Sequence, residues 1–443
     1  MLGACAPLWP TAETPLLDAP PPAQIAQTID RQWWSVFGTP ELNDLVAEAI
    51  ANNLDLAKAA ARVQEARANA GVAEAALVPR VDAIGKSAFS RRQLNGIVRD
   101  TDFDRSTTTN SLGLAASWEI DLWGRIAQTN DAARARLAAS THTRNAVELS
   151  ISSAVVDAYF QLRLFDAKLD ITRQAAINLK EATDLEYRRW KAEAGTELAY
   201  RQSLAELAST EARIPGIEAA IASTELALQL LVGRSPRAMA TPLTRGGALS
   251  LPELPASFDS ALLLRRPDVA SAEQLLVAAQ ADINALRAER YPRLTLALLA
   301  GLVGSSSSIV SGTPTFLDLS AGLSAPLFDG GLIASKVEAG EARKEQAIAS
   351  YRYTLSVAYR DTYEALRLSE AGDRQVAQSR IEVDTRKAAL ALAEKSYAVG
   401  RSSKFEVLSE SIKVLNSELA LSDARFNQFT ARSRYFKALG GGF

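Results

Sequence analysis

The sequence has 443 residues, of which 47% are hydrophobic and 23% charged, so it is too apolar for a disordered chain. Its 49 basic and 51 acidic residues are interspersed and give a net charge of −2, which argues against nucleic acid as a partner. One histidine, His142, and one cysteine, Cys5, cannot supply a Cys/His zinc site or an intrachain disulfide. We expect His142, which lies in a polar run, to be an ordinary solvated side chain.

The first 30 residues predict a lipid anchor followed by a proline-rich spacer. Small residues lead up to Cys5, as in the bacterial lipobox, in which the cysteine is acylated. The charged and apolar parts of a signal peptide are missing before this run, so we expect them upstream of Met1. Six prolines between residues 7 and 22 favour an extended tether. The alternative for Cys5 is a free thiol near a chain end.

Four short segments have the character of membrane β-strands, whereas no run of 18 apolar residues predicts a membrane helix. Most are close to the ~9–11 residues of a tilted membrane strand, and two alternate cleanly between apolar and polar or small residues. Polar loops join them in two pairs, which predicts two β-hairpins. Soluble hairpins packed on helices are the alternative. The predicted strands lie near 81–90, 109–120, 293–303 and 316–326.

These four strands cannot close a barrel, and lipid does not tolerate an open sheet edge, because its backbone groups would be unpaired. If the strands span a membrane, several copies must share one barrel. Two copies would give a barrel of about eight strands filled by its own side chains, whereas three copies leave room for a lumen. The arithmetic favours a homotrimer with a 12-stranded barrel.

Most of the remaining chain is helical and repeats at a constant offset of 207 residues. The halves, about 41–233 and 262–440, each read as helix, hairpin, long helix, turn and long helix. Since the matches fall at structural punctuation, they indicate a duplication. The matched pairs include Gly124 with Gly331, Trp190 with Tyr397, and Gly233 with Gly440.

The longest predicted helices run over 125–193 and 332–399, where proline is absent and glycine is rare. Each is followed by a returning helix with apolar residues at spacings of three and four, which predicts coiled-coil packing. Pro215 should bend the first returning helix. A coiled-coil scaffold would explain these helices alone. Next to membrane hairpins, they predict a helical tube that continues the barrel wall.

Several motifs resemble the outer-membrane factor family of the TolC and OprM type, and in particular its efflux lipoproteins. The resemblance covers the chain from Cys5 to Gly440, and it implies a single duct domain over residues 31–443. The motifs that carry it are Arg31-Gln32-Trp33-Trp34-Ser35-Val36-Phe37, Arg265-Arg266-Pro267-Asp268, Trp118-Glu119-Ile120-Asp121-Leu122-Trp123-Gly124-Arg125, and Pro326-Leu327-Phe328-Asp329-Gly330-Gly331.

The resemblance implies a homotrimer whose 12-stranded barrel lies in the Gram-negative outer membrane and continues as a periplasmic α-helical barrel. It also implies docking to a periplasmic adaptor and to an inner-membrane pump of the resistance-nodulation-division type. The duct itself would have no catalytic step and no cofactor except a covalent lipid on Cys5. It would conduct drugs or other small solutes passively.

The family's pattern also implies where the duct narrows. Tyr397 and Glu406 match its constriction, Ser409 replaces a second acid, and Ala199 stands where the first half often has Asp, so we expect a less acidic constriction here. Ordinary packing for Tyr397 and a solvated helix-start carboxylate for Glu406 are the alternatives. The residues expected to form the adaptor-docking tips are Gly195, Thr196, Gly400, Arg401 and Ser402.

Three other functions remain as alternatives. The same duct could serve protein or peptide secretion, as in type I systems. A non-conducting scaffold of the cell envelope is possible on the helices alone, but the alternating hairpins argue against it. An enzyme is the weakest alternative, because no phosphate loop, nucleophile elbow or metal-ligand constellation is found.

Overall fold

The computed structural model describes residues 31–93, 104–235, 249–254, 260–305 and 315–442, so Cys5 and the spacer lie outside the described residues. The chain divides into two compact units. The first includes Arg62–Thr141 and Ser271–Tyr351, and the second includes His142–Ala270 and Arg352–Phe443. Each unit draws segments from both halves of the sequence repeat. That residues 31–443 act as one duct domain stays a prediction.

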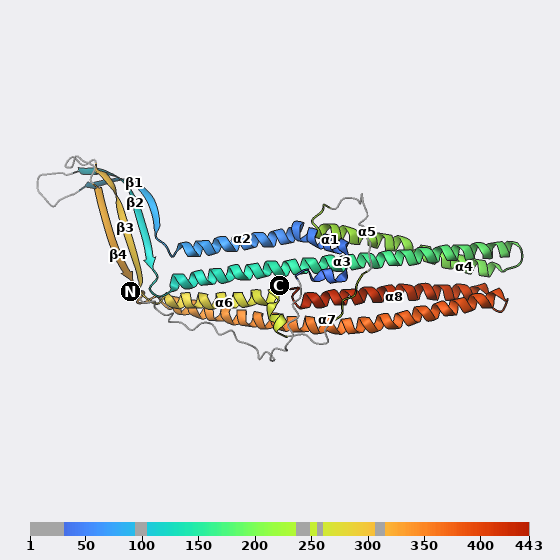
Figure 1. Cartoon of the computed structure of the whole chain (residues 1–443). Helices are drawn as coiled ribbons and strands as arrows, with labels where there is room; N and C mark the ends of the chain where they lie inside the picture. Colours follow the sequence, from blue (N-terminus) through green and yellow to red (C-terminus); the bar gives the residue numbers. More distant parts are fainter. Residues whose placement is uncertain (1–30, 94–103, 236–248, 255–259, 306–314, 443) are drawn as a thin grey trace. The chain divides into compact units, whose positions relative to one another are not determined.

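The first unit contains one four-stranded antiparallel sheet in the order β1-β2-β3-β4 (Figure 1). The two predicted hairpins are therefore joined side by side through β2 and β3. The strands extend beyond the predicted segments at several ends. Their bounds are β1 Arg80–Gln93, β2 Asp104–Ile120, β3 Arg293–Ser305 and β4 Thr315–Ser324.

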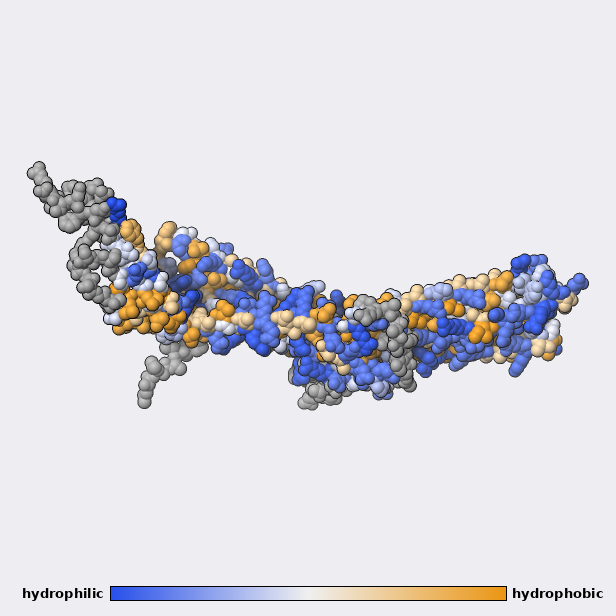
Figure 2. All heavy atoms as spheres, turned by 90° about the horizontal axis from the view of Figure 1, so that it is seen from above, coloured by the Kyte–Doolittle hydropathy of each residue, from blue (hydrophilic) through white to orange (hydrophobic). Residues whose placement is uncertain are grey.

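The two faces of this sheet differ in chemistry, because side chains alternate along each strand and the register aligns them across strands. Polar residues such as Asp82, Ser117 and Ser320 share one face. Large apolar residues share the other, where they are 38% to 76% exposed. Figure 2 has hydrophobic side chains gathered over the sheet. These exposed residues are Val81, Phe89, Leu112, Leu114, Leu298, Leu302, Leu317, Leu319 and Leu323.

Two glycines allow β2 and β3 to approach closely at the centre of the sheet. Gly113 and Gly301 are direct partners in the register. A Cβ on Gly113 would lie 2.6 Å from the Ala300 carbonyl oxygen, and one on Gly301 would lie 2.4 Å from that of Leu112. Both positions therefore require glycine.

Helices pack against one another in the same unit. The Ser271 hydroxyl donates to the Ala139 carbonyl at 3.0 Å, and Asn284 donates to Gln128 at 3.0 Å. Gly340 has no side chain to hold α7 away from Ile283 of α6. The helices that contribute their parts within this unit are α2 Leu54–Ala75, α3 Arg125–Lys191, α6 Pro267–Ala288 and α7 Leu332–Ala398, and each continues into the second unit.

The duplication is visible in the backbone. Helices α3 and α7 have 67 residues each, and their ends match at the offset of 207. The matched pairs also share conformation, since a left-handed residue stands at equivalent places in both halves. These pairs are Gly124 (φ 74°) with Gly331 (φ 87°), Glu193 (φ 57°) with Gly400 (φ 73°), and Gly233 (φ 77°) with Gly440 (φ 94°).

An aromatic core holds the second unit together. Trp33 is 1% exposed and its ring stacks on Phe436 at 6.1 Å, while Phe37 meets Phe160 edge to face at 5.0 Å. The Trp-Trp motif is thus a core element. Elements that complete this unit are η1 Trp33–Phe37, α1 Pro40–Asn52, α4 Glu197–Glu211, α5 Arg213–Leu231, η2 Ser260–Arg265 and α8 Lys404–Ala438.

The predicted bend at Pro215 is a break between α4 and α5 at Ala212. Proline removes the N–H that would bond to the carbonyl of Glu211 and crowds that carbonyl, which explains why the break lies upstream of the proline. Among the described residues, Glu197–Leu231 is the stretch long and apolar enough to cross a membrane by length and composition, yet 17% of its apolar window is buried. Most of that window is therefore not buried within this chain, although Leu207 and Leu228 pack inward.

The Arg-Arg-Pro-Asp motif fastens the start of α6 to the end of α8. The buried Arg266 guanidinium donates to both carboxylate oxygens of Asp268, at 3.1 and 2.8 Å, and to the Ala438 carbonyl at 2.9 Å. Gly440 packs against the Arg266 backbone so closely that a Cβ at position 440 would lie 3.3 Å from the Arg266 Cα. The motif is structural here.

Candidate functional site

The first long hairpin turns between α3 and α4, in the second unit. Glu193 takes the left-handed conformation there, although the sequence places glycine at 195. A Cβ on Gly195 would lie 3.1 Å from that of Arg189, so close approach accounts for that glycine. The Thr196 hydroxyl then caps α4 by accepting the Ala199 N–H at 3.2 Å. The backbone of Glu193, the close approach at Gly195 and the Thr196 cap together define this turn.

The second hairpin turns between α7 and α8 in the same manner. Gly400 supplies the left-handed residue, and its N–H donates to the Tyr397 carbonyl at 2.9 Å. Ser403, which is 207 residues after Thr196, caps α8 by accepting the Glu406 N–H at 3.3 Å. Arg401 is exposed and Ser402 is half-buried. The five residues predicted for the docking tips thus lie in these two turns.

Tyr397 connects the two helical hairpins, α3–α4 and α7–α8. Its hydroxyl accepts a hydrogen bond from Nη1 of Arg189 on α3 at 2.6 Å. The same guanidinium pairs with the buried Glu186 carboxylate at 3.3 Å. Lys404 lies with its Nζ 5.3 Å from the centre of the Tyr397 ring. Tyr397 therefore has partners on both sides, which goes beyond ordinary apolar packing.

Glu406 and Ser409 lie on the first two turns of α8. Glu406 is exposed, and Ser409 is half-buried. Within the part of the chain that the structure describes, neither residue has a side-chain hydrogen bond to Tyr397. The structure therefore brings Tyr397 together with Arg189, Glu186 and Lys404, which sequence reasoning missed.

An aromatic cluster with two cations at the first turn was also missed. The Trp190 and Tyr200 rings stack at 5.4 Å with 10° between their planes, and Tyr187 packs 5.3 Å from Tyr200. Lys191 places Nζ 4.2 Å above the Trp190 ring, and Arg201 lies 5.8 Å from Tyr200. The signal was present in the sequence as three aromatic residues that flank one predicted turn.

The second turn offers no such cluster. At the offset of 207, the counterparts of Tyr187, Trp190, Lys191, Tyr200 and Arg201 are, in order, Glu394, Tyr397, Ala398, Val407 and Leu408. One of the three aromatic positions and neither cation is retained. The two turns therefore share a backbone and differ in surface chemistry.

Comparisons with known proteins place this chain in a protein family. A family model described as outer membrane efflux protein matches residues 45–234 and 260–441. The pyoverdine export outer membrane protein OpmQ of Pseudomonas putida is 32% identical over 96% of this chain and 91% of its own length. The probable outer membrane lipoprotein SilC of Salmonella typhimurium is 28% identical over 100% and 97%. The solved outer-membrane channel OprN superposes with a TM-score of 0.87, at 26% identity, over 99% of both chains.

Proposed function

Because this chain belongs to the outer membrane efflux protein family and acts as an outer-membrane efflux channel, we propose that three copies form one duct of a tripartite efflux system. The observation that carries the proposal is the four-stranded sheet, which has an exposed apolar face and whose outer strands β1 and β4 have no further strand partner among the described residues. In lipid, every backbone polar group needs a partner, so β1 of one copy would pair with β4 of the next. Three copies would give a barrel wide enough for a lumen.

The helices support the same assembly. Leu198, Leu226 and Leu230 of α4 and α5 are 66%, 41% and 64% exposed, and Leu392 and Val399 near the second turn are 66% and 67% exposed. Apolar side chains at coiled-coil spacing favour packing against a neighbouring helix. Neighbouring copies would cover these residues and continue the barrel as a helical tube.

The resting constriction would be made by Tyr397, Glu406 and Ser409 from each copy. Arg189 supports this proposal, because its bond to the Tyr397 hydroxyl joins α7 to α3. Separating the two hairpins would break that bond and widen the opening. The exposed Glu406 would set the charge of the opening, and Ser409 would leave it less acidic than a pair of carboxylates.

The two turns would dock a periplasmic adaptor, which links the duct to an inner-membrane pump. Gly195, Thr196, Gly400, Arg401 and Ser402 would form the docking tips. Tryptophan, tyrosine and arginine are the residues that most often anchor interfaces, so the Trp190 cluster would make the first hairpin the stronger contact. The second hairpin would bind the same partner more weakly.

A covalent lipid on Cys5 would tether the N-terminus to the outer membrane. The similarity to the probable lipoprotein SilC supports this proposal. Radiolabelled palmitate should be incorporated in cells that express the protein and lost in Cys5→Ser, while the barrel still inserts. Labelling that persists in Cys5→Ser would contradict the anchor.

The cargo would be small solutes, and no enzymatic step would be involved. Pyoverdine export, cation efflux and solvent efflux are among the activities named for relatives, and these favour small-solute efflux over protein secretion. The test is conductance of the purified protein in planar bilayers. Discrete channels that grow in number with added protein are expected. A protein that inserts without conducting would support the scaffold instead.

A further inference from the structure

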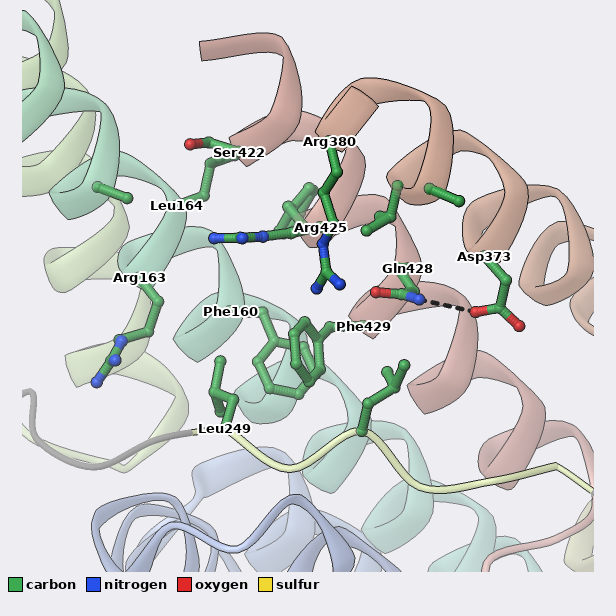
Figure 3. A pocket seen from close by; sticks show the side chains of 15 residues that line it. Phe160, Arg163, Leu164, Leu249, Asp373, Arg380, Ser422, Arg425, Gln428 and Phe429 are labelled. Carbon is green, nitrogen blue, oxygen red and sulfur yellow. Dashed lines mark hydrogen bonds between the residues drawn. The ribbon is translucent and has the colours of Figure 1, made fainter. Parts of the chain in front are cut away.

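A pocket of about 610 Å3 lies within the second unit, between α3, α7, α8 and the extended residues 249–254. Figure 3 shows Phe160 of α3 and Phe429 of α8 side by side in it, and their ring centres are 5.3 Å apart. Phe426, Leu249 and Val376 add further apolar surface. Its size is within the range of pockets that hold drug-sized ligands.

The charged residues that line this pocket include more basic than acidic groups. Asp373 contributes one carboxylate, which already accepts hydrogen bonds from Gln428 at 2.7 Å and from Arg432 at 2.8 Å. Arg163, Arg380 and Arg425 contribute three guanidinium groups. Since Arg432 neutralises Asp373, the lining keeps an excess of positive charge.

Two of the arginines are available to a ligand. Arg380 extends from α7 and Arg425 from α8 over the cavity in Figure 3. Both are exposed, and neither makes a hydrogen bond or ion pair with any residue that the structure describes. A guanidinium offers a planar fork of donors that matches a carboxylate, sulfonate or phosphate.

We propose that this pocket binds an amphipathic organic anion, with its apolar or aromatic body on Phe160 and Phe429 and its acidic group between Arg380 and Arg425. The site is separate from the turns and the sheet, so it goes beyond conduction through the duct. Aromatic rings and guanidinium groups together select against neutral ligands of the same shape, because these leave the arginine donors without an anion. Cationic ligands are disfavoured by repulsion.

The experiment is a calorimetric titration of the full-length protein in dodecyl maltoside with 1-naphthalenesulfonate, and with neutral 1-naphthol as the matched probe. Empty micelles give the background for both probes. The sulfonate should bind saturably and at least tenfold more tightly than the naphthol. Affinity should fall at least tenfold in Arg380→Gln/Arg425→Gln and by less in Arg425→Lys, which keeps the charge without the fork.

Arg374→Gln is the control, because Arg374 is exposed on α7 and does not line the pocket. It should leave the affinity unchanged. Equal binding of both probes, or unchanged binding in the double variant, would overturn the proposal. So would a lack of sulfonate binding in a preparation of native assembled mass, which would mean that a second copy fills the pocket. Bilayer conductance of the same preparation separates any of these results from a failure of the duct itself.

Discussion

Arg189 donates a hydrogen bond to the Tyr397 hydroxyl at 2.6 Å, and so joins two helices whose contacting residues are 208 positions apart in the sequence. The bond lies beside both helix turns, where the guanidinium is also held by the buried Glu186. A hydroxyl and a charged donor form one of the stronger hydrogen bonds in proteins. It is therefore well placed to hold the two hairpins in one resting arrangement.

Tyr397→Phe should loosen that arrangement. The ring remains, while the bond to Arg189 is lost, at a cost on the order of 1.5–3 kcal/mol for a hydrogen bond to a charged group. We expect a larger or more frequent open conductance in planar bilayers. Tyr187→Phe is the control, since Tyr187 packs on the first turn without a hydrogen bond in the described chain. Identical conductance in Tyr397→Phe and wild type would remove Tyr397 from the constriction.

Glu406→Gln should reduce the preference of the resting channel for cations. Three copies would place three such carboxylates around one opening, and the exchange removes the charge with little change in shape. Reversal potentials in a salt gradient measure the preference. Glu394→Gln, an exposed carboxylate on α7, should leave it unchanged. If Glu406→Gln also leaves the reversal potential where it was, Glu406 is only a solvated carboxylate at a helix start.

Leu319→Arg should impair membrane insertion, and Ser320→Arg should not. The two residues are neighbours on β4 and point to opposite faces of the sheet, with Leu319 on the apolar face at 76% exposure. An arginine that faces lipid costs roughly 2–4 kcal/mol at the bilayer midplane. The amount of assembled protein in purified outer membranes reports the difference. Equal amounts of the two variants would mean that this face does not meet lipid.

Asp157→Asn should stabilise the second unit at neutral pH. Burial raises the pKa of the Asp157 carboxyl above its usual 3.8, although the nearby Ser433 hydroxyl and the charges of Arg434 and Lys437 oppose this. A pKa that is higher in the folded protein means that the ionised carboxylate is tolerated less well there. Stability is therefore lost as pH rises from about the unfolded value through the folded pKa.

The amide cannot ionise, so the variant should show a higher Tm at pH 7 and a weaker dependence of Tm on pH above 4. Asp170→Asn, an exposed position on the same helix, is the matched control. Thermal unfolding followed by circular dichroism provides the measurement. A lower Tm for Asp157→Asn at pH 7 would show that the attraction to Arg434 and Lys437 outweighs the burial.

Local pattern was enough to predict the elements and the repeat. The left-handed turns at Gly124 and Gly331, and at Gly233 and Gly440, follow from glycine in matched positions, and the two β-hairpins follow from alternation. Pro215 signalled the break in the returning helix, because its effect on the backbone is local.

Contacts between distant segments could not be predicted in the same way. Glu193 adopts a left-handed conformation that its residue type does not announce, and Gly195 is explained only by the approach of Arg189. The bond between Arg189 and Tyr397, and the pocket of three helices, depend on side chains brought together by packing. No spacing along the chain encodes such distances.

The native mass of the protein, extracted from purified outer membranes in mild detergent, tests the shared barrel most directly. A duct with one shared barrel should give a particle of three chains, each of 47.5 kDa before any lipid is added. Such a particle would have strands enough to close a barrel around a lumen. A monomer would leave the edges of β1 and β4 unpaired, and a dimer would give a barrel filled by its own side chains, so either result would contradict a duct shared by three chains.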